Sequence, residues 1–126
     1  MEKYSVKIAE KVIPLRYTMR ELAAMEEAID TMDQFRDLIL KGKQRLRNMT
    51  TAIRIMGNSG LEKNGEKGDL TDDWLLDHMD PGQIRTYQIA VLGAFTDGFH
   101  MENEGDENRR RDLVLEEIER KKEPGN

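Results

Sequence analysis

The pattern of hydrophobic residues changes at Tyr17-Thr18-Met19-Arg20-Glu21-Leu22. Thr18 and Glu21 have the spacing of a capping box, in which the threonine oxygen accepts the glutamate amide and the glutamate side chain reaches back. Tyr17 and Leu22 occupy the two positions of a hydrophobic staple around this cap. Apolar residues then recur at helical spacing, which predicts a helix over residues 19–29.

Before this cap, apolar and polar residues alternate as they do in half-buried strands. One alternating run is centred on Val6 and the next on Ile13, with a break at Glu10-Lys11. The pattern predicts a β-hairpin over residues 3–17. Pro14 has no N–H to donate, so we expect the second strand to be an edge there, open to a partner strand, or to carry the proline on the solvent side.

Further helices are predicted after residue 30. Thr31, with Gln34, has cap spacing and predicts a short helix that ends near Gly42. A methionine-rich stripe follows over residues 43–57, and we expect Gly57 to stop this helix. The glycine-rich segment over residues 57–70 is predicted to be a mobile loop.

Two more caps precede the last helices. Thr71 is predicted to cap a short helix with two aspartates in its first turn, where the helix dipole favours anions. Asp80 and Pro81 have the character of a cap and a first helical residue. They introduce a helix over residues 81–99, whose apolar stripe is wide enough that we expect it to be the central and most buried helix.

These elements together predict an α+β fold, mainly α, in which an N-terminal β-hairpin packs on a small bundle of about four to five helices. The 126 residues suffice for about one domain, predicted over residues 1–101. Residues 102–126 form a charged C-terminal tail that can fold as an exposed helix but has too few apolar residues to build a core.

Composition narrows the function classes. The chain has no cysteine, which excludes disulfides and thiolate chemistry and suits a reducing cytoplasm. It has no apolar run of about 20 residues that could span a bilayer, and its first residues lack a signal peptide. The net charge of −5 disfavours nucleic acid as a partner. We therefore expect a cytoplasmic protein without membrane contact.

No motif indicates a catalytic, cofactor-binding or metal site. His78 lies among aspartates, but only His100 could add a second imidazole, so a surface histidine near a helix end is favoured over a zinc site. The acidic run over residues 102–107 lacks the register of an EF-hand. Gly57-Asn58-Ser59-Gly60 follows no strand and precedes no GK[ST], which favours a helix C-cap over a phosphate loop. No acid/base pair lies in an apolar setting, so an enzyme is the least favoured class.

Methionine is abundant in this small chain, and its side chain adapts to varied partner surfaces. Most methionines are expected in the core. We expect apolar residues that the monomer leaves exposed to form a partner-binding surface. The residues predicted for this surface are Met25, Phe35, Met49 and Met56.

Several segments follow one another in a characteristic order over residues 6–104. They are Pro14-Leu15-Arg16-Tyr17-Thr18-Met19-Arg20-Glu21-Leu22, a short helix around Phe35, Ile55-Met56-Gly57-Asn58, the glycine-rich loop, Leu70-Thr71-Asp72-Asp73-Trp74-Leu75-Leu76 and Met79-Asp80-Pro81. This order resembles the tail assembly chaperones of long-tailed bacteriophages and prophages, including gene-transfer-agent-like tail chaperones. The long segment over residues 57–70 departs from the usual pattern of that family.

The resemblance implies a protein of the bacterial host cytoplasm that coats the phage tape measure protein until tail tube subunits replace it. It implies no catalytic residue and no cofactor. Two other classes stay open, a structural tail or head-tail component of a prophage and a phage DNA-binding regulatory protein. The second rests on the basic clusters at residues 109–111 and 120–122, which acids interleave as in a solvated helix. Self-association is compatible with each of these classes.

Overall fold

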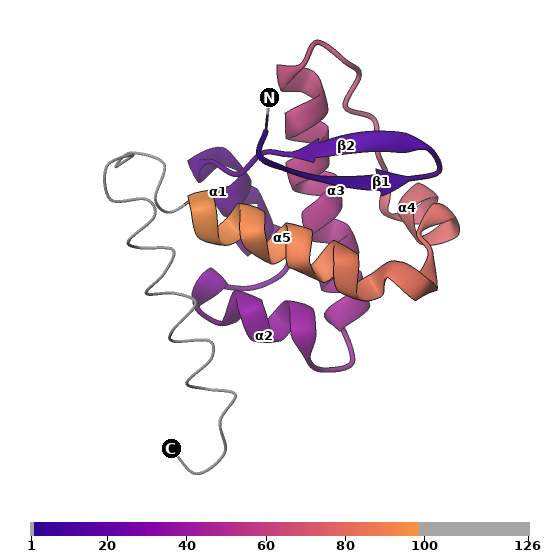
Figure 1. Cartoon of the computed structure of the whole chain (residues 1–126). Coiled ribbons are helices and arrows are strands. Elements are labelled where there is room, and N and C mark those ends of the chain that lie inside the picture. The colour runs from indigo at the N-terminus through magenta and orange to yellow at the C-terminus, as the bar shows by residue number, and fades with distance from the viewer. Residues whose placement is uncertain (1, 99–126) are drawn as a thin grey trace. The chain divides into compact units, whose positions relative to one another are not determined.

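The computed structural model describes residues 2–98, of which residues 2–94 belong to one compact unit. Two strands form an N-terminal hairpin, β1 (Tyr4–Ile8) and β2 (Lys11–Leu15). The helices that follow are α1 (Met19–Ala28), α2 (Phe35–Leu40), α3 (Arg45–Lys63), α4 (Asp72–His78) and α5 (Ile84–Gly98), with short 3-10 turns η1 (Met32–Gln34) and η2 (Pro81–Gln83) before α2 and α5. The predicted α+β class, mainly α with an N-terminal hairpin, is confirmed (Figure 1).

The hairpin closes through Ala9 and Glu10, whose φ angles of 50° and 67° are those of a two-residue type I′ turn. The strands are antiparallel, and Val6 pairs with Ile13. Both of these side chains are buried, whereas Lys7 between the buried positions of β1 is exposed. The alternation in the sequence therefore reflects one covered face of the sheet.

Pro14 pairs with Ser5 at a position where the antiparallel ladder forms no hydrogen bond, so its missing N–H costs nothing there. As predicted, β2 is an edge strand, because the sheet has two strands. Its edge is not open to a partner strand and Pro14 does not face solvent, because Pro14 is buried and its backbone lies against Gly60 of α3. Arg16, just after β2, donates its backbone N–H to the carbonyl oxygen of Met56 at 3.0 Å. Helix α3 therefore covers this edge of the sheet.

The predicted start of α1 at Met19 is confirmed, together with its capping box. Glu21 Oε1 accepts the backbone N–H of Thr18 at 2.5 Å and the Thr18 hydroxyl at 2.6 Å, and Glu21 Oε2 accepts the hydroxyl of Ser59 at 2.7 Å. The glutamate is only 2% exposed. Burial by itself raises the pKa of Glu21, but the hydrogen bonds from Ser59 and Thr18 outweigh it and hold the pKa below its ordinary value. The cap thus also joins α1 to α3.

Of the three caps predicted for the later helices, two are present in the structure. Thr31 forms no side-chain cap, and η1 precedes α2 instead of a regular first helical turn. Thr71 does cap α4, because its hydroxyl oxygen accepts the backbone N–H of Trp74 at 3.1 Å. Asp80 accepts the N–H of Gly82 at 2.9 Å and Pro81 takes the first position of η2, so this predicted cap is also confirmed.

Helix α3 does not stop at Gly57, contrary to the prediction, but continues to Lys63. Gly57 and Gly60 are buried inside it, and the Gly57-Asn58-Ser59-Gly60 segment is helical rather than a C-cap and loop. A Cβ at Gly57 would lie 2.7 Å from Cγ2 of Ile13, and one at Gly60 would collide with the backbone carbonyl of Pro14. The two glycines therefore permit close approach of α3 to β2, and the loop before α4 is shorter than predicted.

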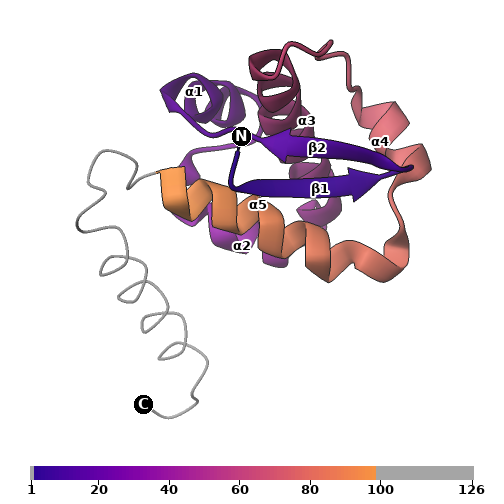
Figure 2. The same cartoon turned by 45° about the horizontal axis from the view of Figure 1, so that its top comes forward.

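The central helix is α3, not the predicted helix over residues 81–99. It packs against β2, α1, α2 and α4, and Figures 1 and 2 show it behind the hairpin and between the shorter helices. Its buried residues are Met49, Thr50, Ala52, Ile53, Met56, Gly57, Gly60 and Leu61. Helix α5 lies alongside β1, where Gly93 contacts the ring of Tyr4, and it leaves Ile89 64% exposed. Helix α5 is therefore covered on one side only.

Candidate functional site

The four residues predicted to form an exposed partner surface are buried. Met25 and Met56 have no exposed side-chain surface, Phe35 is 1% exposed and Met49 is 2% exposed. The prediction of their exposure is wrong, because each lies on the core-facing side of its helix. The sequence could not reveal this, because residues that face the core and residues that face a partner recur at the same helical spacing. Their role in the described structure is to fill the core.

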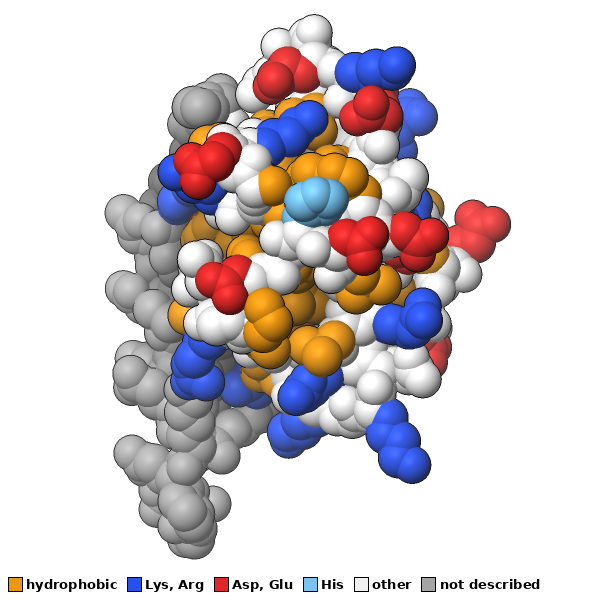
Figure 3. Space-filling view, turned by 90° about the vertical axis from the view of Figure 1, so that its right-hand side faces the viewer, with side chains coloured by type: hydrophobic (Ala, Val, Ile, Leu, Met, Phe, Trp, Pro, Cys, Tyr) orange, Lys and Arg blue, Asp and Glu red, His pale blue; other side chains and the backbone are white. Residues whose placement is uncertain are grey.

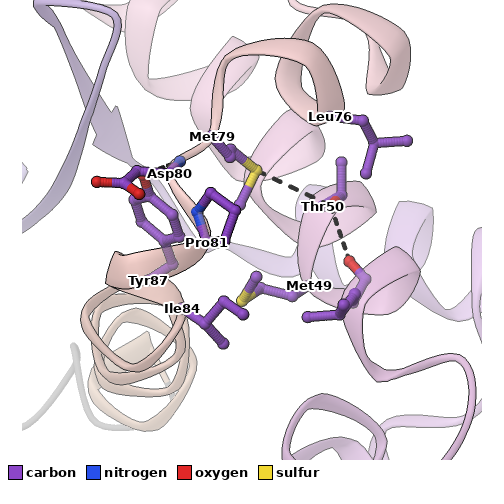
Figure 4. Close-up of a pocket in the computed structure, with 9 residues that line it drawn as sticks. Met49, Thr50, Leu76, Met79, Asp80, Pro81, Ile84 and Tyr87 are labelled. Atoms are coloured by element: carbon purple, nitrogen blue, oxygen red, sulfur yellow. Dashed lines mark hydrogen bonds between the residues drawn. The ribbon is translucent and has the colours of Figure 1, made fainter.

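An apolar pocket of about 160 Å³ lies between the first turns of α3, the end of α4, the turn η2 and the start of α5 (Figure 4). Its lining residues are Leu46, Met49, Thr50, Leu76, Met79, Asp80, Pro81, Ile84 and Tyr87. Of the four residues predicted for a partner surface, Met49 alone contributes to this lining. The pocket is therefore assembled from two stretches that are separate in the sequence, residues 46–50 and residues 76–87.

Two leucines lie at the rim of the pocket and keep a large exposed surface. Leu46 of α3 is 38% exposed and Leu76 of α4 is 45% exposed. Deeper in, Met49 and Tyr87 are buried. Figure 3 shows several apolar side chains on the face that carries α4, among polar and charged ones. Exposed apolar residues next to an apolar hollow are typical of a binding surface.

The polar atoms of the pocket are largely engaged with neighbouring groups. The Thr50 hydroxyl donates to the carbonyl oxygen of Leu46 at 2.7 Å and lies 3.9 Å from the Met79 sulfur. The Tyr87 hydroxyl oxygen accepts the backbone N–H of Asp80 at 3.0 Å, which fixes the turn between α4 and α5 (Figure 4). The pocket therefore offers a ligand apolar contact and soft methionine sulfur rather than a set of free hydrogen-bonding groups.

Sequence reasoning missed most of this pocket. One signal was present at Leu75-Leu76, because a short helix cannot bury two consecutive leucines on one face. Leu75 is fully buried, and Leu76 points away from that core contact. The other lining residues give no comparable signal, since Ile84 and Tyr87 belong to a stripe that also packs in the core.

His78 lies at the exposed end of α4, as predicted. Its ring stacks on Trp74 with 4.5 Å between ring centroids, and Nδ1 lies 2.8 Å from the Trp74 carbonyl oxygen. Within residues 2–98, no three His, Asp or Glu side chains are grouped so that they could hold a metal ion. His100, the acidic run over residues 102–107, the basic clusters and the predicted tail over residues 102–126 lie outside the described residues.

Among the helices that the structure describes, none combines the length and the apolar character needed to cross a bilayer. Comparison with protein-family models, with curated proteins and with solved structures found no match to this chain. The resemblance to tail assembly chaperones therefore stays a prediction from the order of the segments.

Proposed function

We propose that this chain is a phage tail assembly chaperone that binds the tape measure protein and keeps it soluble during tail assembly. The observation that supports this proposal best is the open apolar pocket with Leu46 and Leu76 at its rim. A free tape measure protein would expose long apolar stripes along its helices. A helix laid across the pocket would bury both rim leucines and place one of its own apolar side chains inside.

The size of the pocket suits one side chain of this kind. Engineered protein cavities of about 150 Å³ take up benzene, and the pocket measures about 160 Å³. Burial of one such side chain contributes about 1.5–3 kcal/mol. Binding at a single pocket would therefore be weak, which fits a protein that coats a long helix in many copies and must later give way to tail tube subunits.

The test is co-expression of the full chain with a helical fragment of a tape measure protein that is insoluble alone. The wild-type chain should raise the soluble fraction of that fragment. Leu46→Asp with Leu76→Asp should abolish the gain, because two charges would then border the pocket. Ile89→Asp is the matched control, since Ile89 is equally apolar and even more exposed but does not line the pocket.

Two results would contradict the proposal. An unchanged soluble fraction with the wild-type chain would remove the chaperone role, and equal loss with Ile89→Asp would remove the pocket from it. The competing classes have their own signatures. Presence of the chain in purified virions would favour a structural tail or head-tail component, and salt-dependent retention on DNA would favour a regulatory protein.

A further inference from the structure

Basic residues surround the rim leucine of α3, Leu46, in the sequence. Lys41, Lys43, Arg45 and Arg47 fall within one short stretch around Leu46, and the first turn of α3 contains no acidic residue. The N-terminus of a helix carries partial positive charge, so cations there oppose the stability of the helix. Lys41 has a partner in Asp37 at 3.8 Å. Within residues 2–98, Lys43, Arg45 and Arg47 form no ion pair.

Acidic residues lie on either side of the rim leucine of α4, Leu76, in the sequence. Leu76 is followed by Asp77 and preceded by Asp73 one helical turn earlier, and both aspartates are exposed. Asp72 on the same helix is engaged, because its Oδ1 lies 2.8 Å from Nε of Arg54. No ion pair among the described residues involves Asp73 or Asp77. Each rim leucine is thus accompanied by charges of one sign.

Figure 3 shows charged side chains of both signs on the face that carries α4. Lys and Arg side chains lie below the apolar side chains of this face, and Asp and Glu side chains lie to their right and to their left. A helix seated across the pocket would meet positive charge at one end of its apolar contact and negative charge at the other. Complementary charges select partners and fix their orientation more than they add affinity.

We infer that the pocket selects a bipolar helical segment of a partner protein, with acidic residues facing Lys43 and Arg47 and basic residues facing Asp73 and Asp77. This inference rests on the proposed function of the pocket and adds the chemistry and direction of its partner. The apolar side chain supplies the contact, and the charges decide which stretch of a long helix is bound and which way it runs. Stretches with one sign of charge on both sides are rejected at one rim.

The test uses three stapled helical peptides of about 20 residues, long enough to cross the site. All carry the same Leu, Phe and Leu at positions i, i+3 and i+7, and the staple on the opposite face keeps their helicity equal. One peptide has glutamates at one end and lysines at the other, one has glutamates at both ends and one has lysines at both ends. The full-length wild-type chain should bind the bipolar peptide about fivefold more tightly than either other peptide in fluorescence anisotropy. This preference should vanish near 0.5 M salt because ions screen exposed charges.

A charge-reversed variant sharpens the test. Lys43→Glu with Arg47→Glu should make the all-lysine peptide the tightest ligand. Lys63→Glu with Lys67→Glu changes the net charge equally at the other end of α3, where both lysines are exposed, and should leave the order of the peptides unchanged. Circular dichroism melting checks that both variants fold.

The failures can be told apart. Equal binding of the three peptides would overturn the charge selection and leave the pocket standing, whereas no binding of any peptide would overturn both. Displacement of the bipolar peptide by duplex DNA, lost in Lys43→Glu with Arg47→Glu, would assign the cations to phosphate and overturn the inference. A wild-type dimer in sedimentation that this variant dissociates would assign them to a second copy of the chain and overturn it as well.

Discussion

The two ends of α3 have opposite surroundings. Toward its C-terminus, Gly60 lies so close to β2 that even a Cβ has no room against Pro14. Toward its N-terminus, Leu46 borders a pocket of about 160 Å³. Protein interiors are normally close-packed. Because one end of α3 is packed so tightly, the open space at its other end does not reflect loose packing of the whole fold. One end of α3 therefore stabilises the fold, and the other end is available to a partner.

The largest expected effect is at the tight end. Gly60→Ala should lower the free energy of unfolding by about 3 kcal/mol, because the new methyl group meets backbone that cannot rotate away. Gly57→Ala should cost less, about 1 kcal/mol, since its methyl group meets the side-chain ends of Ile13 and Leu70 and gains helix propensity. Urea denaturation measures both. Equal values would show that the backbone contact at Gly60 relaxes as easily as a side chain.

The next effect concerns the buried carboxylate that ties α1 to this end of α3. Glu21→Gln should lower the free energy of unfolding by about 2 kcal/mol at neutral pH, because a charged acceptor of the Thr18 and Ser59 hydrogen bonds is lost. Glu27→Gln, on an exposed position of α1, is the control and should change little.

The same residue predicts a pH dependence. The pKa of Glu21 lies below its ordinary value of 4.5 in the folded chain, so the unfolded chain binds the proton more readily. The stabilisation is fully present above pH 4.5 and is lost as the pH falls through the lower folded pKa. The difference in unfolding free energy between the wild type and Glu21→Gln should therefore shrink in acid. A constant difference between neutral and acidic pH would refute this account of the cluster.

A smaller effect is expected at the cap itself. Thr18→Ala should cost about 1 kcal/mol, since the hydroxyl that meets Glu21 is removed, and Thr18→Ser should restore most of it. Lys67→Ala, in the loop after α3, should leave the melting temperature almost unchanged because its side chain is exposed. Equal melting shifts for Thr18→Ala and Lys67→Ala would count against the stabilising role of the capping box.

The smallest effect on stability is expected at the open end. Leu46→Asp with Leu76→Asp should change the free energy of unfolding by less than about 0.5 kcal/mol for each site, because both leucines are already partly in water. A loss as large as that of Gly60→Ala would show that the two ends of α3 do not differ in this way. A rim that stabilises the monomer strongly would be part of the core rather than a surface for a partner.

Local patterns predicted the elements that depend on neighbouring residues. The alternation around Val6 and Ile13 predicted the hairpin, and Thr18, Thr71 and Asp80 predicted the starts of helices. These predictions held because a strand face and a helix cap are built from residues within a few positions of one another. The site itself was not predicted, because residues 46–50 of α3 and residues 76–87, from α4 to α5, come together only in the folded chain.

The sequence by itself determined the α+β class, the hairpin and the capped helix starts, since these follow from hydrophobic period and local hydrogen bonding. Only the tertiary structure decided that Gly57 continues a helix, because a glycine that ends a helix and one that admits a neighbouring strand look alike in sequence. It also decided that Met56 is core while Leu46 borders a pocket, although both belong to one helical stripe. The exposure of a residue in such a stripe depends on whether a neighbouring element extends far enough to cover it. The extent of this cover is set by packing between distant segments.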